Sequence, residues 1–200
     1  MDLTMFNKLI FNVLVFATLA LSVSAEAEEL SQSKYDEKAQ LCEICHQNGN
    51  DAFVPHLAGQ STEYILKQFE RYKNGERKSG IMTTVVNSFQ SESEMRAVAD
   101  YFSKQPPKRT HGGSGEAFYS GKHMFEQTYA CAGCHGFDGM GKVEPTLVVP
   151  MLAGQKKDYL VQRLVSFREA EHDEGNPMTR VAKKLTDEDI AVVAGYLSDM

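Results

Sequence analysis

Two short stretches of the sequence carry all four of its cysteines. In each stretch, two cysteines stand three positions apart and a histidine follows the second one directly. The six residues are Cys42, Cys45 and His46 in the first stretch and Cys131, Cys134 and His135 in the second. Thiols and an imidazole at this spacing could bind zinc, perform dithiol redox chemistry or attach a haem covalently. A valid interpretation has to explain both copies and leave no cysteine over.

Two of these three chemistries fit the spacing poorly. A zinc ribbon needs two cysteine pairs roughly 15 to 20 residues apart so that four ligands converge, whereas 85 residues lie between Cys45 and Cys131. A redox dithiol gives no reason for a histidine after each pair. On a helix, cysteines at positions i and i+3 share a face, so both sulfurs can form thioethers to one haem while the next histidine reaches the iron. The motif therefore predicts two covalently bound haem c groups, with His46 and His135 as iron ligands.

The first 25 residues have the order of an export signal. Lys8 precedes an apolar run from Leu9 to about Leu21, and small residues then lead to Ala25. This order is typical of a secretory signal peptide. An uncleaved membrane anchor is the alternative, but the apolar run is shorter than the roughly 20 residues that cross a bilayer. We expect export and cleavage near Ala25.

The charge of the chain argues against nucleic-acid partners. The net charge is −6 at pH 7. Residues 26–105 hold 9 basic and 13 acidic side chains, and residues 106–200 hold 11 and 13. Neither half has the basic surplus that binding to phosphates requires. The 42% of apolar residues is enough for one or two small globular domains.

The chain is a tandem duplication that extends well beyond the cysteine motifs. Pro55–Phe69 matches Pro150–Leu164 at a constant offset of 95 residues, and the two segments share Pro, Leu-Ala-Gly-Gln and Tyr. After an adjustment by one residue, Met82 aligns with Met178. The duplication predicts two domains of similar fold.

The boundary between the two halves falls in a stretch rich in proline and glycine. Pro106 and Pro107 end a helix, and Gly112 and Gly113 form a loop. The expected organisation is a signal peptide at 1–25, a first domain at 26–105, a linker at 106–114 and a second domain at 115–200.

The pattern of apolar residues predicts helices joined by loops. One helical face follows each P-x-L-A-G-Q segment, formed by Tyr64, Ile65, Gln68, Phe69 and Tyr72 in the first half and by Tyr159, Leu160, Leu164 and Phe167 in the second. The last helix of each half opens with a capping-box pattern, Ser91 with Glu94 and Thr186 with Asp189. No stretch alternates as a strand would, and the glycine-rich residues 136–142 are expected to form a turn beside the second haem.

Met82 and Met178 are the candidates for the sixth ligand of the two irons. Their positions are equivalent in the duplication, and each is expected in a loop between two amphipathic helices. A methionine opposite a histidine raises the reduction potential of haem iron and suits electron transfer.

Other methionines and histidines fit the role of sixth ligand less well. Met95 lies on an apolar helical face and is expected in the core. His56 and Met151 occupy the same position of the repeat, close to a proximal histidine, which argues that neither is a ligand, although His56 stays an alternative for the first iron. The histidines without a repeat partner, expected at the surface, are His111, His123 and His172.

The order of these motifs resembles the dihaem cytochromes c of the cytochrome c4 type. Each C-x-x-C-H is followed by P-x-L-A-G-Q, a helix that carries a tyrosine, a methionine and a final helix. The resemblance covers nearly the whole chain after residue 25. It implies an all-α fold with two tandem cytochrome c-like domains related by pseudo-twofold symmetry. It also implies that the carbonyls of Pro55 and Pro150 accept a hydrogen bond from the proximal histidines and orient them.

The resemblance further implies an electron carrier of the periplasm and not an enzyme. Such a protein carries single electrons between respiratory redox partners, a quinol-oxidising complex on one side and a terminal oxidase or reductase on the other. Peripheral association with the membrane stays open. The alternative is the dihaem cytochrome subunit of a dehydrogenase such as flavocytochrome c sulfide dehydrogenase. A dihaem peroxidase needs an open or displaceable sixth position, and a candidate methionine in each half argues against it.

Overall fold

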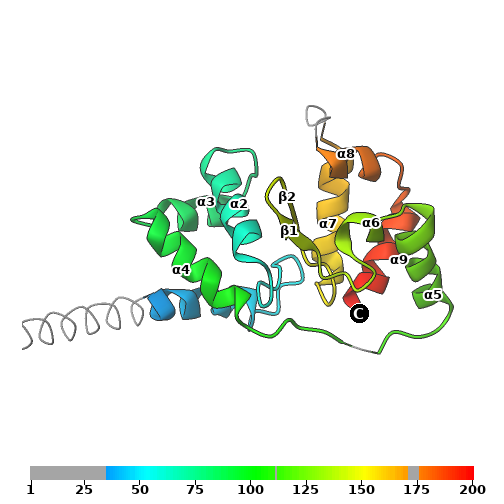
Figure 1. Ribbon diagram of the computed structural model, residues 1–200, viewed down its shortest axis with the longest axis horizontal. Coiled ribbons are helices and arrows are strands. Elements are labelled where there is room, and N and C mark those ends of the chain that lie inside the picture. Colours follow the sequence, from blue (N-terminus) through cyan, green and yellow to red (C-terminus); the bar gives the residue numbers. More distant parts are fainter. Residues whose placement is uncertain (1–34, 111, 171–175) are drawn as a thin grey trace, which may run out of the picture.

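The computed structural model describes residues 35–110, 112–170 and 176–200, which form two groups of helices, one from each half of the chain (Figure 1). The predicted signal peptide, His111 and His172 lie outside these residues. Within the described ranges, no helix has both the length and the apolar character that crossing a membrane would require.

The first half consists of helices that begin at polar capping residues. Residues 35–46 form a helix that contains the first cysteine motif. It is followed by α2 (Thr62–Lys73), α3 (Gly80–Asn87) and α4 (Glu92–Ser103). Serine side chains at positions 61, 79 and 91 accept backbone N–H groups of the first turns of these three helices, which satisfies donors that have no partner inside the helix.

The second half repeats this plan with an added hairpin. Its elements are α5 (Glu116–His123), the π-helical turn η1 (Met124–Thr128), α6 (Ala132–His135), β1 (Lys142–Glu144), β2 (Leu147–Val149), α7 (Lys157–Arg168), α8 (Pro177–Ala182) and α9 (Asp187–Ser198). Helices α5 and α9 cross so closely that a Cβ at Gly121 would lie 2.5 Å from Cβ of Tyr196.

The expectation that every element is a helix or a loop was wrong at one place. Strands β1 and β2 pair in antiparallel fashion, with Val143 opposite Val148. Valines on both sides of a turn at Pro145 and Thr146 favour this pairing. The hairpin follows the predicted glycine turn, and β2 contacts α2 of the first half (Figure 1).

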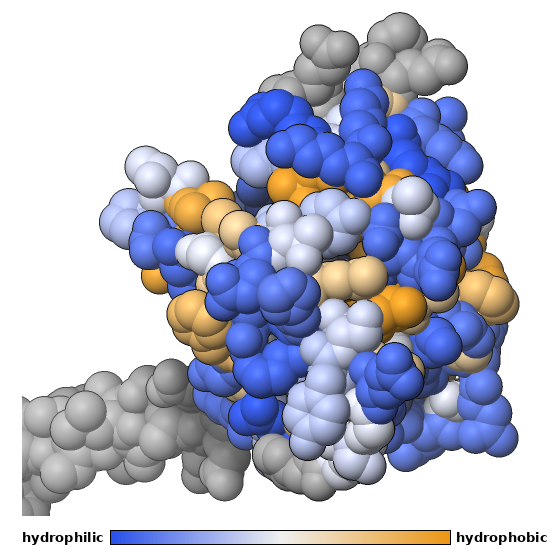
Figure 2. Space-filling view, turned by 90° about the vertical axis from the view of Figure 1, so that its right-hand side faces the viewer, coloured by the Kyte–Doolittle hydropathy of each residue, from blue (hydrophilic) through white to orange (hydrophobic). Residues whose placement is uncertain are grey.

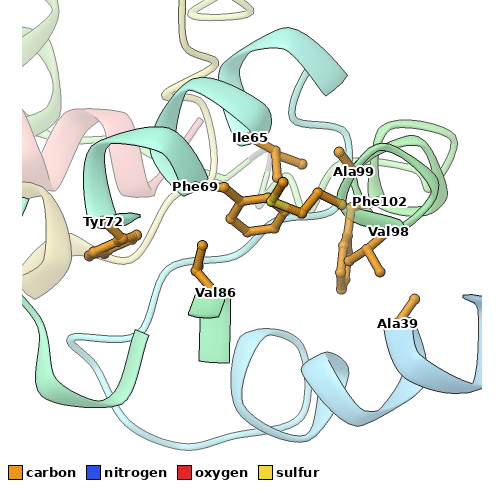
Figure 3. Packing of buried hydrophobic residues seen from close by; sticks show 9 residues of the cluster. Ala39, Ile65, Phe69, Tyr72, Val86, Val98, Ala99 and Phe102 are labelled. Carbon is orange, nitrogen blue, oxygen red and sulfur yellow. The ribbon is translucent and has the colours of Figure 1, made fainter. Parts of the chain in front are cut away.

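A hydrophobic core fills the first half. Its buried members are Ala39, Ile65, Phe69, Tyr72, Val86, Met95, Val98, Ala99 and Phe102. Figure 3 shows these side chains converging from α2, α3, α4 and the helix at residues 35–46. Of the face predicted for α2, Ile65, Gln68, Phe69 and Tyr72 are buried, whereas Tyr64 is partly exposed. The core position of Met95 is confirmed.

The second core has equivalent sources. Its buried residues are Phe125, Ala132, Leu160, Val193, Ala194, Tyr196 and Leu197. Of the face predicted for α7, Tyr159 and Leu160 are buried, whereas Leu164 and Phe167 are partly exposed.

Only one of the two predicted capping boxes is complete. In α9, the side chain of Thr186 accepts the backbone N–H of Asp189, and the carboxylate of Asp189 accepts the backbone N–H of Thr186. In α4, Ser91 accepts the N–H of Glu94, but the carboxylate of Glu94 accepts the N–H of Gln90 at 2.7 Å and pairs with Lys38 at 2.8 Å. The carboxylate of Glu94 thus binds Lys38 of the helix at residues 35–46 and the N–H of Gln90, in place of the expected N–H of Ser91.

The two halves meet through polar and aromatic side chains. Arg77 of the first half donates to the hydroxyl of Tyr159 at 3.0 Å. Lys156 of the second half donates to the carbonyls of Gly49 and Asp51 at 3.1 and 2.8 Å. Burial, together with the neighbouring Tyr159, raises the pKa of Tyr64 to about 12. Tyr64 keeps part of its surface exposed, so the interface shields this side chain only in part.

The linker passes close to the glycine of the second P-x-L-A-G-Q segment. Gly154 has a φ of 70° and donates its N–H to the carbonyl of Leu197 at 2.8 Å. A Cβ on this glycine would lie 1.7 Å from the carbonyl oxygen of Lys108. The segment therefore has room for glycine alone.

We expect Gly154→Ala to destabilise the protein more than Gly75→Ala. Gly75 has a similar φ of 78° but no heavy atom within 4 Å of a built Cβ, so its substitution costs only about 1–2 kcal/mol of left-handed strain. The clash at Gly154 should add about 1–3 kcal/mol. Free energies of unfolding from guanidinium titrations compare the two variants, and equal losses would contradict the close contact with the linker.

Candidate haem centres

Each motif histidine is held by the carbonyl of a proline. Nδ1 of His46 lies 2.8 Å from the carbonyl oxygen of Pro55, and Nδ1 of His135 lies 3.0 Å from that of Pro150. A carbonyl can only accept, so Nδ1 carries the hydrogen and Nε2 keeps its lone pair for a metal. The predicted contact of both prolines with the proximal histidines is confirmed.

The surroundings of both histidines favour the neutral imidazole. Burial is the largest cause and lowers the pKa of His46; the hydrogen bond to the Pro55 carbonyl raises it in part, and the charges of Lys156 and Arg77 lower it by smaller amounts. Burial also lowers the pKa of His135. The neutral ring is the form that binds a metal, so both side chains are ready to act as ligands near pH 7.

The cysteines of each motif differ in their surroundings. Cys42 and Cys131 pack at the edges of the two cores, whereas Cys45 and Cys134 are exposed. Burial raises the pKa of both inner thiols. In each pair, one thiol lies at the edge of the core and the other faces solvent. This arrangement suits the attachment of a haem that has one exposed edge.

The candidate methionines are not in loops, which corrects the expectation from the sequence. Met82 lies in the first turn of α3 and Met178 in the first turn of α8. The side chain of Ser79 accepts the N–H of Met82 at 3.2 Å, and that of Asn176 accepts the N–H of Met178 at 3.0 Å. These caps, helped by a proline at the first position of α8, start helices where the sequence suggested loops.

Both halves therefore place the methionine in the first turn of a capped helix, Met82 as the third residue of α3 and Met178 as the second of α8. Met82 is partly buried and packs against the first core, and Met178 is also partly buried. Ile81 before Met82 and Pro177 before Met178 differ in the sequence, yet both methionines follow a capping side chain.

Further features fit the presence of a large apolar group. Leu41 and Ile44, in or beside the first motif, and Ile81, beside Met82, are 67%, 61% and 77% exposed. A haem attached to the adjacent cysteines could cover such side chains, which favours binding by about 25 cal/mol per Å². In the second half, the buried hydroxyl of Thr179, beside Met178, has no hydrogen-bond partner within the described part of the chain. The residues thus suit a haem in each half.

His56 and Met151 lie near the proximal histidines. Nδ1 of His56 is 3.4 Å from the carbonyl oxygen of His46. Met151 follows Pro150 directly and is buried. Both positions support the prediction that these residues are not sixth ligands. His123 is exposed, as the sequence analysis expected.

Sequence analysis missed two residues that contact these sites indirectly. Gln60 and Gln155, the last residues of the two P-x-L-A-G-Q segments, are buried and bind the backbone of the opposite half. The signal was present, because both glutamines belong to the repeat. Nothing in the pattern indicated that each faces the other copy.

Known proteins share this arrangement. A family model described as Cytochrome c matches residues 119–200. Cytochrome c4 from Pseudomonas aeruginosa is 33% identical over 207 residues, which cover 97% of this chain and 99% of the relative. The solved structure of reduced recombinant cytochrome c4 from Pseudomonas stutzeri has a TM-score of 0.73 at 28% identity, with 84% of this chain and 97% of that one covered. The cytochrome c4 structure from Acidithiobacillus ferrooxidans has a TM-score of 0.69 at 33% identity, with 80% and 98% covered.

Fold, repeated motif and histidine geometry together define a dihaem cytochrome c built from tandem helical domains. The chain belongs to the cytochrome c4 family. It carries two covalent haem c groups and is an electron-transfer protein and not an enzyme. The predicted family, cofactors and helical fold class are thus confirmed, with the hairpin as an addition.

Proposed function

We propose that this protein is a periplasmic carrier that takes up and releases single electrons between respiratory redox partners. The observation that carries the proposal is the repeated proximal geometry, in which His46 and His135 each donate Nδ1–H to a proline carbonyl behind a cysteine pair. The haem iron, when bound, supplies a one-electron couple between Fe(III) and Fe(II). The chain contributes the ligands, their orientation and the exclusion of water.

We propose one set of ligands for each haem. Cys42 and Cys45 hold the first haem by thioethers, and Cys131 and Cys134 hold the second. The iron of the first haem is bound by His46 and Met82, and that of the second by His135 and Met178. The neutral histidines, the core-edge thiols and the equivalent capping of both methionines support this set.

The proposed domain organisation keeps the signal peptide at 1–25, the first domain at 26–105, the linker at 106–114 and the second domain at 115–200. Helix α4 ends at Ser103 and α5 begins at Glu116, so the linker has no helix or strand of its own among its described residues. Removal of the signal peptide in the periplasm would leave a chain that carries both haem motifs.

Docking on the partners should be weak and transient. The face of the second half in Figure 2 is mainly hydrophilic, with hydrophobic residues between the hydrophilic ones. Electron-transfer contacts of this kind are typically small, with less than about 1,200 Å² of buried area. Such contacts suit a carrier that must leave each partner after one electron.

We expect the native protein to purify from a periplasmic extract without a bound partner and to exchange electrons with membranes. Purification from its own host at high salt should yield no stoichiometric partner. Membranes supplied with a quinol should reduce the protein, and the same membranes under oxygen should oxidise it. A flavoprotein that copurifies in a fixed ratio at high salt would instead identify a dehydrogenase subunit.

A further inference from the structure

Each half of the molecule holds one backbone segment of the other half through a glutamine. Oε1 of Gln155 accepts the N–H of His56 at 2.9 Å, and its Nε2 donates to the His56 carbonyl at 3.0 Å. Oε1 of Gln60 accepts the N–H of Met151 at 3.0 Å, and its Nε2 donates to the Met151 carbonyl at 3.1 Å. We call these two paired contacts the glutamine bridges. The two glutamines are 4% and 5% exposed, so water does not compete for these bonds.

The N–H group in each bridge belongs to a peptide unit that also binds a proximal histidine. The peptide between Pro55 and His56 accepts Nδ1–H of His46 at its carbonyl and donates its N–H to Gln155. The peptide between Pro150 and Met151 accepts Nδ1–H of His135 and donates to Gln60 in the same way. A continuous chain of two hydrogen bonds therefore runs from each proximal histidine to the opposite half.

Hydrogen bonds in such a chain polarise one another in a buried setting. A peptide whose N–H donates to a glutamine oxygen has a more negative carbonyl, which accepts a stronger hydrogen bond from the histidine. A histidine that donates more strongly through Nδ1 is a more basic ligand through Nε2. A more basic ligand favours Fe(III), so each bridge should lower the potential of the haem to which its peptide belongs.

We propose that Gln155 tunes the reduction potential of the first haem and Gln60 that of the second, each acting from the opposite half as a positioning residue. The inference rests on the proposed function, since it requires a haem on both His46 and His135. It gives the reciprocal interface a role in electron transfer, because the relative position of the halves then affects both potentials.

Other contacts keep the halves together when one bridge is lost. Arg77 still donates to Tyr159, and Lys156 to the backbone of residues 49 and 51. Within each half, the glycine before the glutamine donates to the carbonyl of the final helix, Gly59 to Phe102 at 2.9 Å and Gly154 to Leu197 at 2.8 Å. A single glutamine variant should therefore keep its fold.

The test compares Gln155→Met with Gln60→Met in the full-length protein with both haems. Methionine has a similar length but neither the acceptor oxygen nor the donor. Redox titrations, with each haem assigned through the spectra of methionine-ligand variants, should show a crossed pattern. Gln155→Met should raise the potential of the first haem and leave that of the second unchanged. Gln60→Met should raise the potential of the second haem and leave that of the first unchanged.

Tyr159→Phe is the control, because it removes a hydrogen bond between the halves that does not involve a proline peptide. Arg77 still donates to the side chain of Gln68 at 2.8 Å, so its charge stays in place and this variant should leave both potentials unchanged. The inference would be overturned if the potential of the haem in the same half as the mutated glutamine shifted, if both potentials shifted equally or if neither shifted. It would also be overturned if Tyr159→Phe raised the potential of the first haem as Gln155→Met does. A wild-type protein without two haems would instead refute the proposed function.

Discussion

Replacing Met178 with alanine should open the sixth position of the second iron and leave the first unchanged. Methionine opposite histidine keeps haem iron low-spin and raises its potential. We therefore expect half of the ferric haem to become high-spin, the potential of the second haem to fall and carbon monoxide to bind at that site. Ferric absorption spectra, redox titration and carbon monoxide binding report these three changes.

Met82→Ala should give the converse result at the first iron. Met95→Leu is the matched control, because Met95 is buried in the first core and its substitution should leave both irons low-spin. A Met82 variant with wild-type spectra would contradict the assignment and favour the alternative ligand His56. High-spin iron in the wild-type protein would contradict the assignment in the half that contains it.

Replacing Phe102 with alanine should cause a large loss of stability. Its side chain is fully buried, and it packs with residues of α2, α4 and the helix at 35–46 (Figure 3). Truncation of a buried phenylalanine costs about 3–5 kcal/mol, because transfer free energy is lost and a cavity is left. Guanidinium unfolding followed at the haem absorption band measures the change.

Tyr119→Ala provides the comparison for this substitution. Tyr119 is an aromatic residue of α5 with 63% of its surface exposed, so its removal should change the free energy of unfolding by no more than about 0.5 kcal/mol. Similar losses in the two variants would contradict the central place of Phe102 in the first core.

The sequence was sufficient for the parts of the site that covalent chemistry determines. Thioether attachment requires two cysteines and a histidine at one spacing, so the motif at Cys42 and its copy at Cys131 could be recognised without a structure. The duplication then aligned Met82 with Met178, and the structure places each in the capped first turn of a short helix, at its third and second residue respectively.

The errors arose where short-range signals competed. Asn176 and Pro177 are helix-start signals, but α8 has only 6 residues, too few for a clear apolar period. The hairpin has strands of 3 residues, too short for alternation to be visible. The carboxylate of Glu94 does not complete the capping box of α4; it binds the N–H of Gln90 and Lys38, a residue far away in the sequence.

The contacts between the halves could not be predicted for a different reason. Repetition shows that Gln60 and Gln155 are equivalent, but it says nothing of which surfaces of the two copies meet. Their reciprocal bonds depend on a pseudo-twofold arrangement that only the folded chain provides.

The intact mass of the exported protein after acid-acetone extraction tests the assignment of two covalent haems most directly. The extraction removes any haem that is not covalently bound. The measured mass should equal that of a polypeptide beginning near Glu26 plus two haem groups, since all four cysteines belong to complete motifs. A mass that corresponds to one haem or to the bare polypeptide would contradict this account.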